Sequence, residues 1–216
     1  MILNNFKKRF LTSLFLLLLF FLIFKSYIIL NYCLIVLGVL SILEFLNLSR
    51  KIFKNKLGLI LLNIFFISYI FIFCFIFLMF FNNTLLKYTL SIILFGCIAS
   101  DIGGFIFGKL FKGPKLTKIS PNKTYSGAIG SIVLTLITVS ILFYYFLKIF
   151  NLDTIILALV VSIFCQLGDL LFSLLKRKAK IKDTGNILPG HGGVLDRLDG
   201  IYLGIPVGIL TLALLH

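Results

Sequence analysis

Acidic residues are scarce in this sequence, with only seven Asp and Glu residues against 21 Lys and Arg. The four cysteines are scattered through apolar stretches and form no C-x-x-C pair. This argues against a disulfide framework or a cysteine metal site and favours cysteines as small buried residues. Long polar linkers are absent as well, so we expect one domain that covers residues 1–216.

Polar residues are too few for a water-soluble globule. Hydrophobic residues make up 60% of the chain and the mean hydropathy is +1.14, whereas soluble domains are about 45–50% apolar. The net charge of +14 could indicate nucleic-acid binding. However, the cations lie in short loops between apolar spans, which is typical of membrane proteins. We therefore expect an all-α polytopic protein that resides in a lipid bilayer and binds no nucleic acid.

Long apolar runs divide the chain into expected membrane spans, each needing about 20 apolar residues, or somewhat fewer where the membrane is thin. The first run resembles a secretory signal peptide, but no small-x-small cleavage site follows it, so we expect it to be retained as a helix. The run 57–81 could be one tilted helix or two short ones, which leaves the count open by one. The seven expected spans are 11–24, 27–47, 57–81, 85–110, 126–147, 154–175 and 200–215.

The distribution of Lys and Arg predicts the orientation in the membrane. With the N-terminus on the cytoplasmic side, 18 cations fall on that side and only Lys25, Lys87 and Lys148 fall on the other. Such a bias sets orientation strongly, so we expect the N-terminus and all candidate site groups to be cytoplasmic. The high content of Ile, Phe, Lys and Asn is typical of an AT-rich bacterial genome, which indicates a bacterial inner membrane.

Charge is concentrated between residues 168 and 200, which hold four of the seven acids, six of the 21 cations and one of the two histidines. Asp169, Ser173 and Lys176 are spaced to form one stripe on a helix. An ionised carboxylate within the membrane is costly and needs a partner or a metal ion. A purely structural pair between Asp169 and a nearby lysine is the alternative. Gly168 would allow another backbone or a ligand to approach closely.

A glycine-rich loop follows at residues 188–193, because three glycines and one proline in six residues cannot sustain a helix. Backbone N–H groups in such a loop can hold phosphate oxygens, although a plain turn between helices is the alternative. Asp196 and Asp199 are three residues apart and face the same way, which suits a divalent cation. Together these features predict a site for phosphate and metal.

Basic residues near these carboxylates are candidates for phosphate binding. The run 176–182 could be only a flank attracted to anionic lipid, but Lys176, Arg177 and Lys182 lie close to the acids in sequence and suit phosphate. In the segment 120–127, Lys123 adjoins small hydroxyl residues at the start of an expected helix, which favours phosphate.

Two acidic residues outside the 168–200 stretch have open roles. Asp101 adjoins Gly103 and Gly104 in the fourth span, where helix packing explains the glycines but not the acid. Glu44 at the end of the second span could simply pair with Ser49, Arg50 or Lys51.

Residues 173–199 follow the pattern S-x-x-K-R-x-x-x-x-K-D-x-G-x-x-L-P-x-H-G-G-x-x-D-R-x-D. This pattern resembles the signature of phosphatidate cytidylyltransferases, also called CDP-diacylglycerol synthases, and its 27 residues hold too many fixed positions to match readily by chance. The S-P-x-K-T-x-x-G segment at 120–127, Asp101 and the region of Glu44 also resemble that family. Family members commonly carry an aromatic–acid pair before the last glycine of this segment, whereas this chain has Tyr125 and Ser126, so the acid is missing.

The resemblance implies a magnesium-dependent transfer of CMP from CTP to phosphatidate in phospholipid biosynthesis, which yields CDP-diacylglycerol and pyrophosphate. It implies Asp169 and Asp196 as the Mg²⁺ ligands. We expect Asp183 and Asp199 to complete the metal shell, and Lys182 and Asp183 to act with the two ligands as catalytic residues. We expect the remaining substrate contacts to come from Lys123, Ser173, Lys176, Arg177, His191, Gly192, Gly193, Arg197 and Asp199.

Two other functions stay open at this stage. A CTP-dependent polyprenol or dolichol-type lipid kinase would use similar residues to transfer the γ-phosphoryl group. An ion transporter could use Asp101 and Asp169 as a relay, although the sequence shows no inverted repeat of the kind that transporters often have. The sequence also leaves open a homodimer and the preference for acyl chains.

Overall fold

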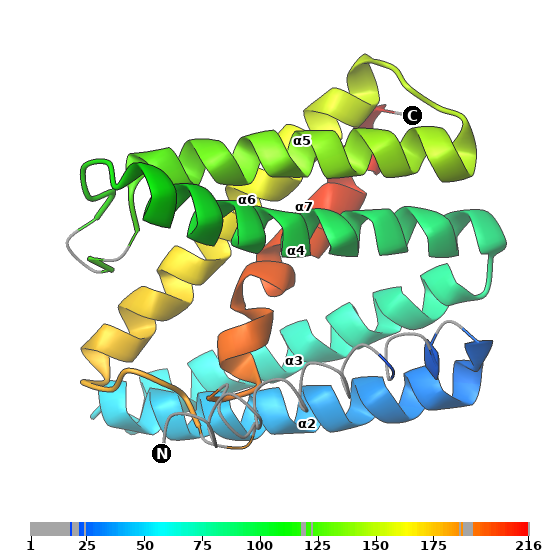
Figure 1. Cartoon of the computed structure of the whole chain (residues 1–216). Helices are drawn as coiled ribbons and strands as arrows, with labels where there is room; N and C mark the ends of the chain where they lie inside the picture. The colour runs from blue at the N-terminus through cyan, green and yellow to red at the C-terminus, as the bar shows by residue number, and fades with distance from the viewer. Residues whose placement is uncertain are drawn as a thin grey trace. The chain divides into compact units, whose positions relative to one another are not determined.

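Long helices make up nearly all of the computed structural model, which describes residues 18, 22–23, 25–117, 120–121, 123–185, 187 and 192–215 (Figure 1). This described part contains six helices, and each is long and apolar enough to cross a membrane. These residues contain one isolated antiparallel bridge, between Lys115 and Thr124. The chain is therefore an all-helical polytopic membrane protein, as predicted. The helices are α2 (Tyr27–Ile52), α3 (Lys56–Phe81), α4 (Thr84–Phe111), α5 (Tyr125–Leu147), α6 (Leu152–Lys178) and α7 (Leu195–Leu215).

Six of the seven expected spans correspond to these helices. The run 57–81 lies in the single helix α3 and not in two short ones. The expected first span, 11–24, lies almost wholly outside the described residues, of which it contains positions 18, 22 and 23. The structure thus confirms the class of fold and the six later spans, and the first span stays a prediction.

Several helices extend beyond the ends that the sequence predicted. Helix α6 continues to Lys178, three residues past the expected end at residue 175, and α7 begins five residues before the expected start at residue 200. The expected spans were cut at the last apolar residue, but Lys and Arg are good helix formers and are stabilised in the last turn by the helix dipole. Correspondingly, Asp196 lies in the first turn of α7, where a negative charge is favourable.

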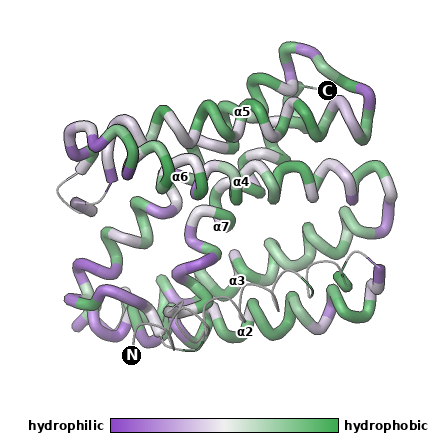
Figure 2. Tube along the Cα trace, in the orientation of Figure 1, coloured by the Kyte–Doolittle hydropathy of each residue, from purple (hydrophilic) through white to green (hydrophobic). Residues whose placement is uncertain are grey.

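The helices group into two compact units. Unit 1 comprises Met1–Leu78 with Leu175–Arg197, and unit 2 comprises Met79–Leu174 with Leu198–His216. The boundaries fall within α6 and α7, so each of these helices contributes residues to both units. The expectation of a single domain over 1–216 stays a prediction. Hydrophilic residues gather in the connections between helices, whereas the helices themselves are mostly apolar (Figure 2).

Glycines allow close helix packing in unit 2. A Cβ atom added at Gly103 of α4 would lie 2.5 Å from the carbonyl oxygen of Gly130 in α5. A Cβ atom at Gly168 of α6 would lie 2.6 Å from the carbonyl oxygen of Asp199 in α7. Both distances are far below van der Waals contact, so only glycine fits these crossings. The glycine beside Asp101 therefore serves packing, and Gly168 admits a neighbouring backbone, as predicted.

Helices α2 and α3 form the larger part of unit 1. The rings of Phe45 and Phe66 stack with their centroids 3.7 Å apart. The hydroxyl of Ser49 donates to Oδ1 of Asn63 at 2.7 Å and to the carbonyl of Leu46 at 3.1 Å. These contacts pack α2 against α3.

Candidate active site

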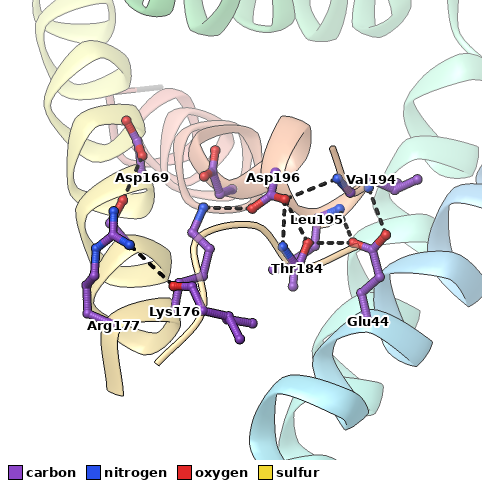
Figure 3. Close-up of polar contacts among 12 residues, drawn as sticks. Glu44, Asp169, Lys176, Arg177, Thr184, Val194, Leu195 and Asp196 are labelled. Carbon is purple, nitrogen blue, oxygen red and sulfur yellow. Dashed lines mark hydrogen bonds and ion pairs between the residues drawn. The ribbon is translucent and has the colours of Figure 1, made fainter. Parts of the chain in front are cut away.

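Asp196 is the most tightly held of the predicted site residues. Its side chain is only 8% exposed, and its Oδ1 atom accepts a hydrogen bond from Nζ of Lys176 at 2.7 Å. Its Oδ2 atom accepts from the backbone N–H of Thr184 at 2.8 Å, the Thr184 hydroxyl at 3.0 Å and the N–H of Gly193 at 3.1 Å. Figure 3 shows this arrangement around Asp196. One oxygen is thus fixed by three neutral donors, and the other faces a cation.

Glu44 of α2 holds the start of α7. This carboxylate is 3% exposed and accepts from the backbone N–H groups of Val194 at 3.0 Å and Leu195 at 2.9 Å (Figure 3). It also accepts from the hydroxyl of Thr184 at 2.7 Å. The first N–H groups of a helix have no partner within the helix, so Glu44 satisfies two of them in α7. The partners expected for Glu44 from its sequence neighbours, Ser49, Arg50 and Lys51, were therefore the wrong ones.

Asp169 forms the second charged pair, in unit 2. Its Oδ2 atom lies 2.5 Å from Nζ of Lys123, and the two side chains are 35% and 22% exposed. Ser173, one turn further along α6, donates its hydroxyl to Oδ1 of Asp169 at 3.3 Å. Asp169, Ser173 and Lys176 all lie on α6, as predicted for the stripe. The structural alternative, a pair between Asp169 and a lysine, is also present, and the α4–α5 connection supplies the lysine.

The α4–α5 connection places Lys123 through its own hydrogen bonds. The N–H of Leu116 donates to the carbonyl of Lys123 at 2.7 Å, and the N–H of Lys123 donates to Ser120 at 3.1 Å. Thr124 caps α5 by accepting from the N–H of Gly127 at 3.1 Å. This is the cap that a Thr at the start of a helix commonly provides.

Ser126 occupies the position where the resembled pattern has an acid. Its hydroxyl accepts from the N–H of Gly113 at 3.3 Å and lies 3.0 Å from the hydroxyl of Thr124. The neutral hydroxyl of Ser126 therefore links the start of the α4–α5 connection, at Gly113, to its end, at Thr124.

The remaining predicted site residues differ in their exposure to solvent. Asp199 is 7% exposed, and its Oδ1 atom accepts from the N–H of Gly200 at 2.9 Å. Gly192 has a φ angle of +86°, which favours glycine. His191 lies outside the described residues. The exposed members of the predicted set are Arg177, Lys182, Asp183 and Arg197.

Sequence reasoning missed Glu44 and Thr184 as contributors to this site. Thr184 and Glu44 contact each other although they lie more than 100 positions apart in the chain. Glu44 also contacts the backbone N–H of Val194, so no local sequence pattern connects these groups. A weak signal existed in the glycines of the 173–199 pattern. A Cβ atom at Gly185 would lie 2.6 Å from Oε1 of Glu44, and one at Gly193 would lie 2.5 Å from Oε2. Two glycines of the pattern therefore make room for this carboxylate.

The donor atoms suit a magnesium ion that is shared with a ligand. Within the described part of the chain, no three His, Cys, Asp or Glu side chains cluster closely enough to hold a metal ion by themselves. Mg²⁺ usually takes one or two carboxylates together with substrate phosphates and water. Asp169 and Asp196 each offer a carboxylate that already attracts a lysine ammonium group, so both fit this mode of binding.

Comparison with known proteins identifies relatives of this chain. Residues 3–215 match the family described as the cytidylyltransferase family. The chain is 48% identical over 112 residues to the phosphatidate cytidylyltransferase of Staphylococcus haemolyticus (strain JCSC1435), covering 50% of this chain and 42% of that protein. It is 41% identical over 133 residues to the phosphatidate cytidylyltransferase of Bacillus subtilis (strain 168), covering 59% of this chain and 49% of that protein. It is 43% identical over 140 residues to the phosphatidate cytidylyltransferase of Rickettsia typhi (strain ATCC VR-144 / Wilmington), covering 60% of this chain and 61% of that protein. The chain spans about half the length of the curated relatives it matches.

Proposed function

The chain belongs to the cytidylyltransferase family, and on this premise we propose that it transfers CMP from CTP to phosphatidate, forming CDP-diacylglycerol and pyrophosphate. The observation that carries the proposal is the lysine paired with each of two carboxylates, Lys123 with Asp169 and Lys176 with Asp196. Asp196 and Lys176 lie within the 173–199 pattern, and Asp169 lies one turn before it. Such pairs supply both the anionic and the cationic groups that a reaction between two phosphates requires.

The reaction asks for little covalent chemistry from the protein. An oxygen of the phosphatidate phosphate forms a bond to the α-phosphorus of CTP. The bond from that phosphorus to the oxygen that bridges to the β-phosphate breaks, and pyrophosphate leaves with the bond electrons. Since both substrates are polyanions, the protein mainly brings them together and stabilises the charge of the leaving group.

The lysines and arginines are suited to bind these phosphates. Lys123 and Lys176 are held by the carboxylates that they pair with, so their ammonium groups have defined positions. Lys182 is exposed in the loop before α7, and Arg197 is exposed in the first turn of α7, so both would reach phosphate oxygens from solvent. A guanidinium group can bind two phosphate oxygens at once, which suits Arg197 and Arg177.

Asp196 in unit 1 and Asp169 in unit 2 would each offer a carboxylate to Mg²⁺, and Asp183 and Asp199 would orient groups near the carboxylate of their own unit. When bound, the ion would neutralise phosphate charge and stabilise the leaving pyrophosphate. On Asp196, Oδ2 already accepts three hydrogen bonds, so Oδ1 is the atom we assign to the cation. The Ser173 hydroxyl, which donates to Asp169, would fix the orientation of that carboxylate.

The lipid substrate would reach the protein from the membrane. Large apolar side chains such as Phe71 and Leu110, 73% and 70% exposed, cover the helices and would contact acyl chains. The connections α2–α3, α4–α5 and α6–α7, together with the helix ends that flank them, carry 15 of the 21 Lys and Arg residues, so we place them on the cytoplasmic side of a bacterial inner membrane. The phosphatidate head group would then reach the charged residues at the cytoplasmic interface.

The test uses purified protein in detergent with phosphatidate, Mg²⁺ and CTP labelled on either the α or the γ phosphate. We expect α label to enter the lipid while pyrophosphate is released. Transfer of γ label to an alcohol acceptor such as dolichol would identify a lipid kinase instead. If folded protein transferred neither label, the nucleotidyltransferase proposal would fail and an ion transporter would regain weight.

A further inference from the structure

Glu44 is a buried acid within an apolar helix, and its position requires an explanation. An ionised carboxylate is costly at such a place unless hydrogen bonds compensate it. In this chain the compensation comes from the start of α7, where Val194 and Leu195 donate their N–H groups to the two carboxylate oxygens. The partial positive charge at a helix N-terminus further favours a negative group there.

The neighbouring glycines show how closely the 173–199 pattern is fitted to this carboxylate. A Cβ atom at Gly193 would lie 2.2 Å from the Thr184 hydroxyl oxygen and 2.5 Å from Oε2 of Glu44. One at Gly185 would lie 2.6 Å from Oε1. Any side chain at these two positions would push the loop away from α2.

A short chain of hydrogen bonds links Glu44 to Asp196. The Thr184 hydroxyl shares its single proton between Oε2 of Glu44 at 2.7 Å and Oδ2 of Asp196 at 3.0 Å. The backbone N–H of Thr184 also donates to Oδ2 of Asp196 at 2.8 Å. Leu195 donates its N–H group to Glu44 and immediately precedes Asp196 in the chain. Glu44 therefore fixes both the backbone that carries Asp196 and the residue that holds its Oδ2 atom, which leaves Oδ1 directed toward Lys176.

We propose that Glu44 is a positioning residue for Asp196, acting through Thr184 and the first turn of α7. This inference rests on the proposed function, because it gives Asp196 Oδ1 the role of holding the cation used with CTP. Glu44 touches neither substrate nor metal in this account. Loss of the Glu44 carboxylate would let the Asp196 carboxylate rotate. This would weaken cation binding in protein that is still folded.

The variants are E44Q, which keeps the size of the side chain but turns one acceptor into a donor, and T184V, which removes only the linking hydroxyl. The matched control is S49A, which removes a buried hydroxyl on the same helix that contacts Asn63 and not α7. Two readouts are taken, the Mg²⁺ concentration for half-maximal transfer of α label and the rate of amide hydrogen exchange in residues 192–198 of the metal-free protein.

We expect E44Q and T184V to need about tenfold more Mg²⁺, the equivalent of one lost hydrogen bond of about 1.4 kcal/mol, and E44Q to exchange its 192–198 amides faster. S49A should match the wild type in both readouts. A wild-type Mg²⁺ requirement in folded E44Q and T184V would overturn the inference, and T184V decides alone if E44Q does not fold. Absence of transfer by the wild type would instead refute the proposed function, whereas the ratio of variant to wild type tests Glu44.

Discussion

Removal of the Lys176 ammonium group should destabilise the protein through Asp196. The two side chains are 11% and 8% exposed, so the pair is largely shielded from water. Breaking a buried ion pair by removing one partner typically costs about 3–5 kcal/mol, because the remaining charge stays buried. Three hydrogen bonds to the other oxygen of Asp196 remain. We therefore expect K176M to lose about 3 kcal/mol of unfolding free energy, at the lower end of this range.

The assay is a denaturant titration in detergent micelles that follows helix content by circular dichroism, with and without Mg²⁺. The control is K178M, which removes an exposed lysine two positions along the same helix and should cost little. Mg²⁺ should restore part of the stability of K176M, because a cation held by Asp196 would replace the missing charge. If K176M and K178M unfold at the same denaturant concentration, the reasoning about the buried pair is refuted. An equal loss with and without Mg²⁺ would contradict the assignment of a cation to Asp196.

Three further predictions concern the other charged pair, the helix packing and the orientation. K123M should raise the KM for CTP at least about tenfold in a steady-state assay, as expected when a charge-assisted phosphate contact is lost; an unchanged KM would exclude this lysine from the nucleotide site. G168A should lower the thermal midpoint by overpacking, at a cost of about 1–3 kcal/mol, whereas G58A, where an added Cβ would meet only a side chain at 3.8 Å, should not lower it. Cysteines replacing Lys54 and Lys148 should react with a membrane-impermeant reagent from opposite sides of sealed inner-membrane vesicles, and labelling from one side only would refute the orientation.

Much of the fold could be predicted because long apolar runs can be stable only in a bilayer as helices. The helix ends could not, since hydropathy says where a helix is apolar and not where its hydrogen bonds end. Lys176 and Asp196 illustrate this, because both lie outside the expected spans 154–175 and 200–215 and both lie on helices. Their helical positions bring the end of α6 and the start of α7 close enough for the ion pair.

The sequence indicated candidate residues for the site but not the contacts between them. The 173–199 pattern indicated Lys176 and Asp196, yet nothing in it shows that they pair with each other. The role of Glu44 was missed because its partners lie about 140–150 residues further along the chain. Gly193 was interpreted only as part of a phosphate loop and Gly185 only as a position of the 173–199 pattern, whereas the structure shows that both admit the Glu44 carboxylate.

The most direct test of the central claim compares the wild type with D196N in the transfer of α label from CTP to phosphatidate, at equal amounts of folded protein. Asn keeps the size of the side chain, and its amide oxygen can still accept hydrogen bonds from Thr184 and Gly193. The change removes the negative charge and the acceptor that faces Lys176. The account predicts Mg²⁺-dependent transfer by the wild type and a loss of more than about 100-fold in D196N, as when a group that stabilises transition-state charge is removed. Transfer by folded D196N at close to the wild-type rate would contradict it.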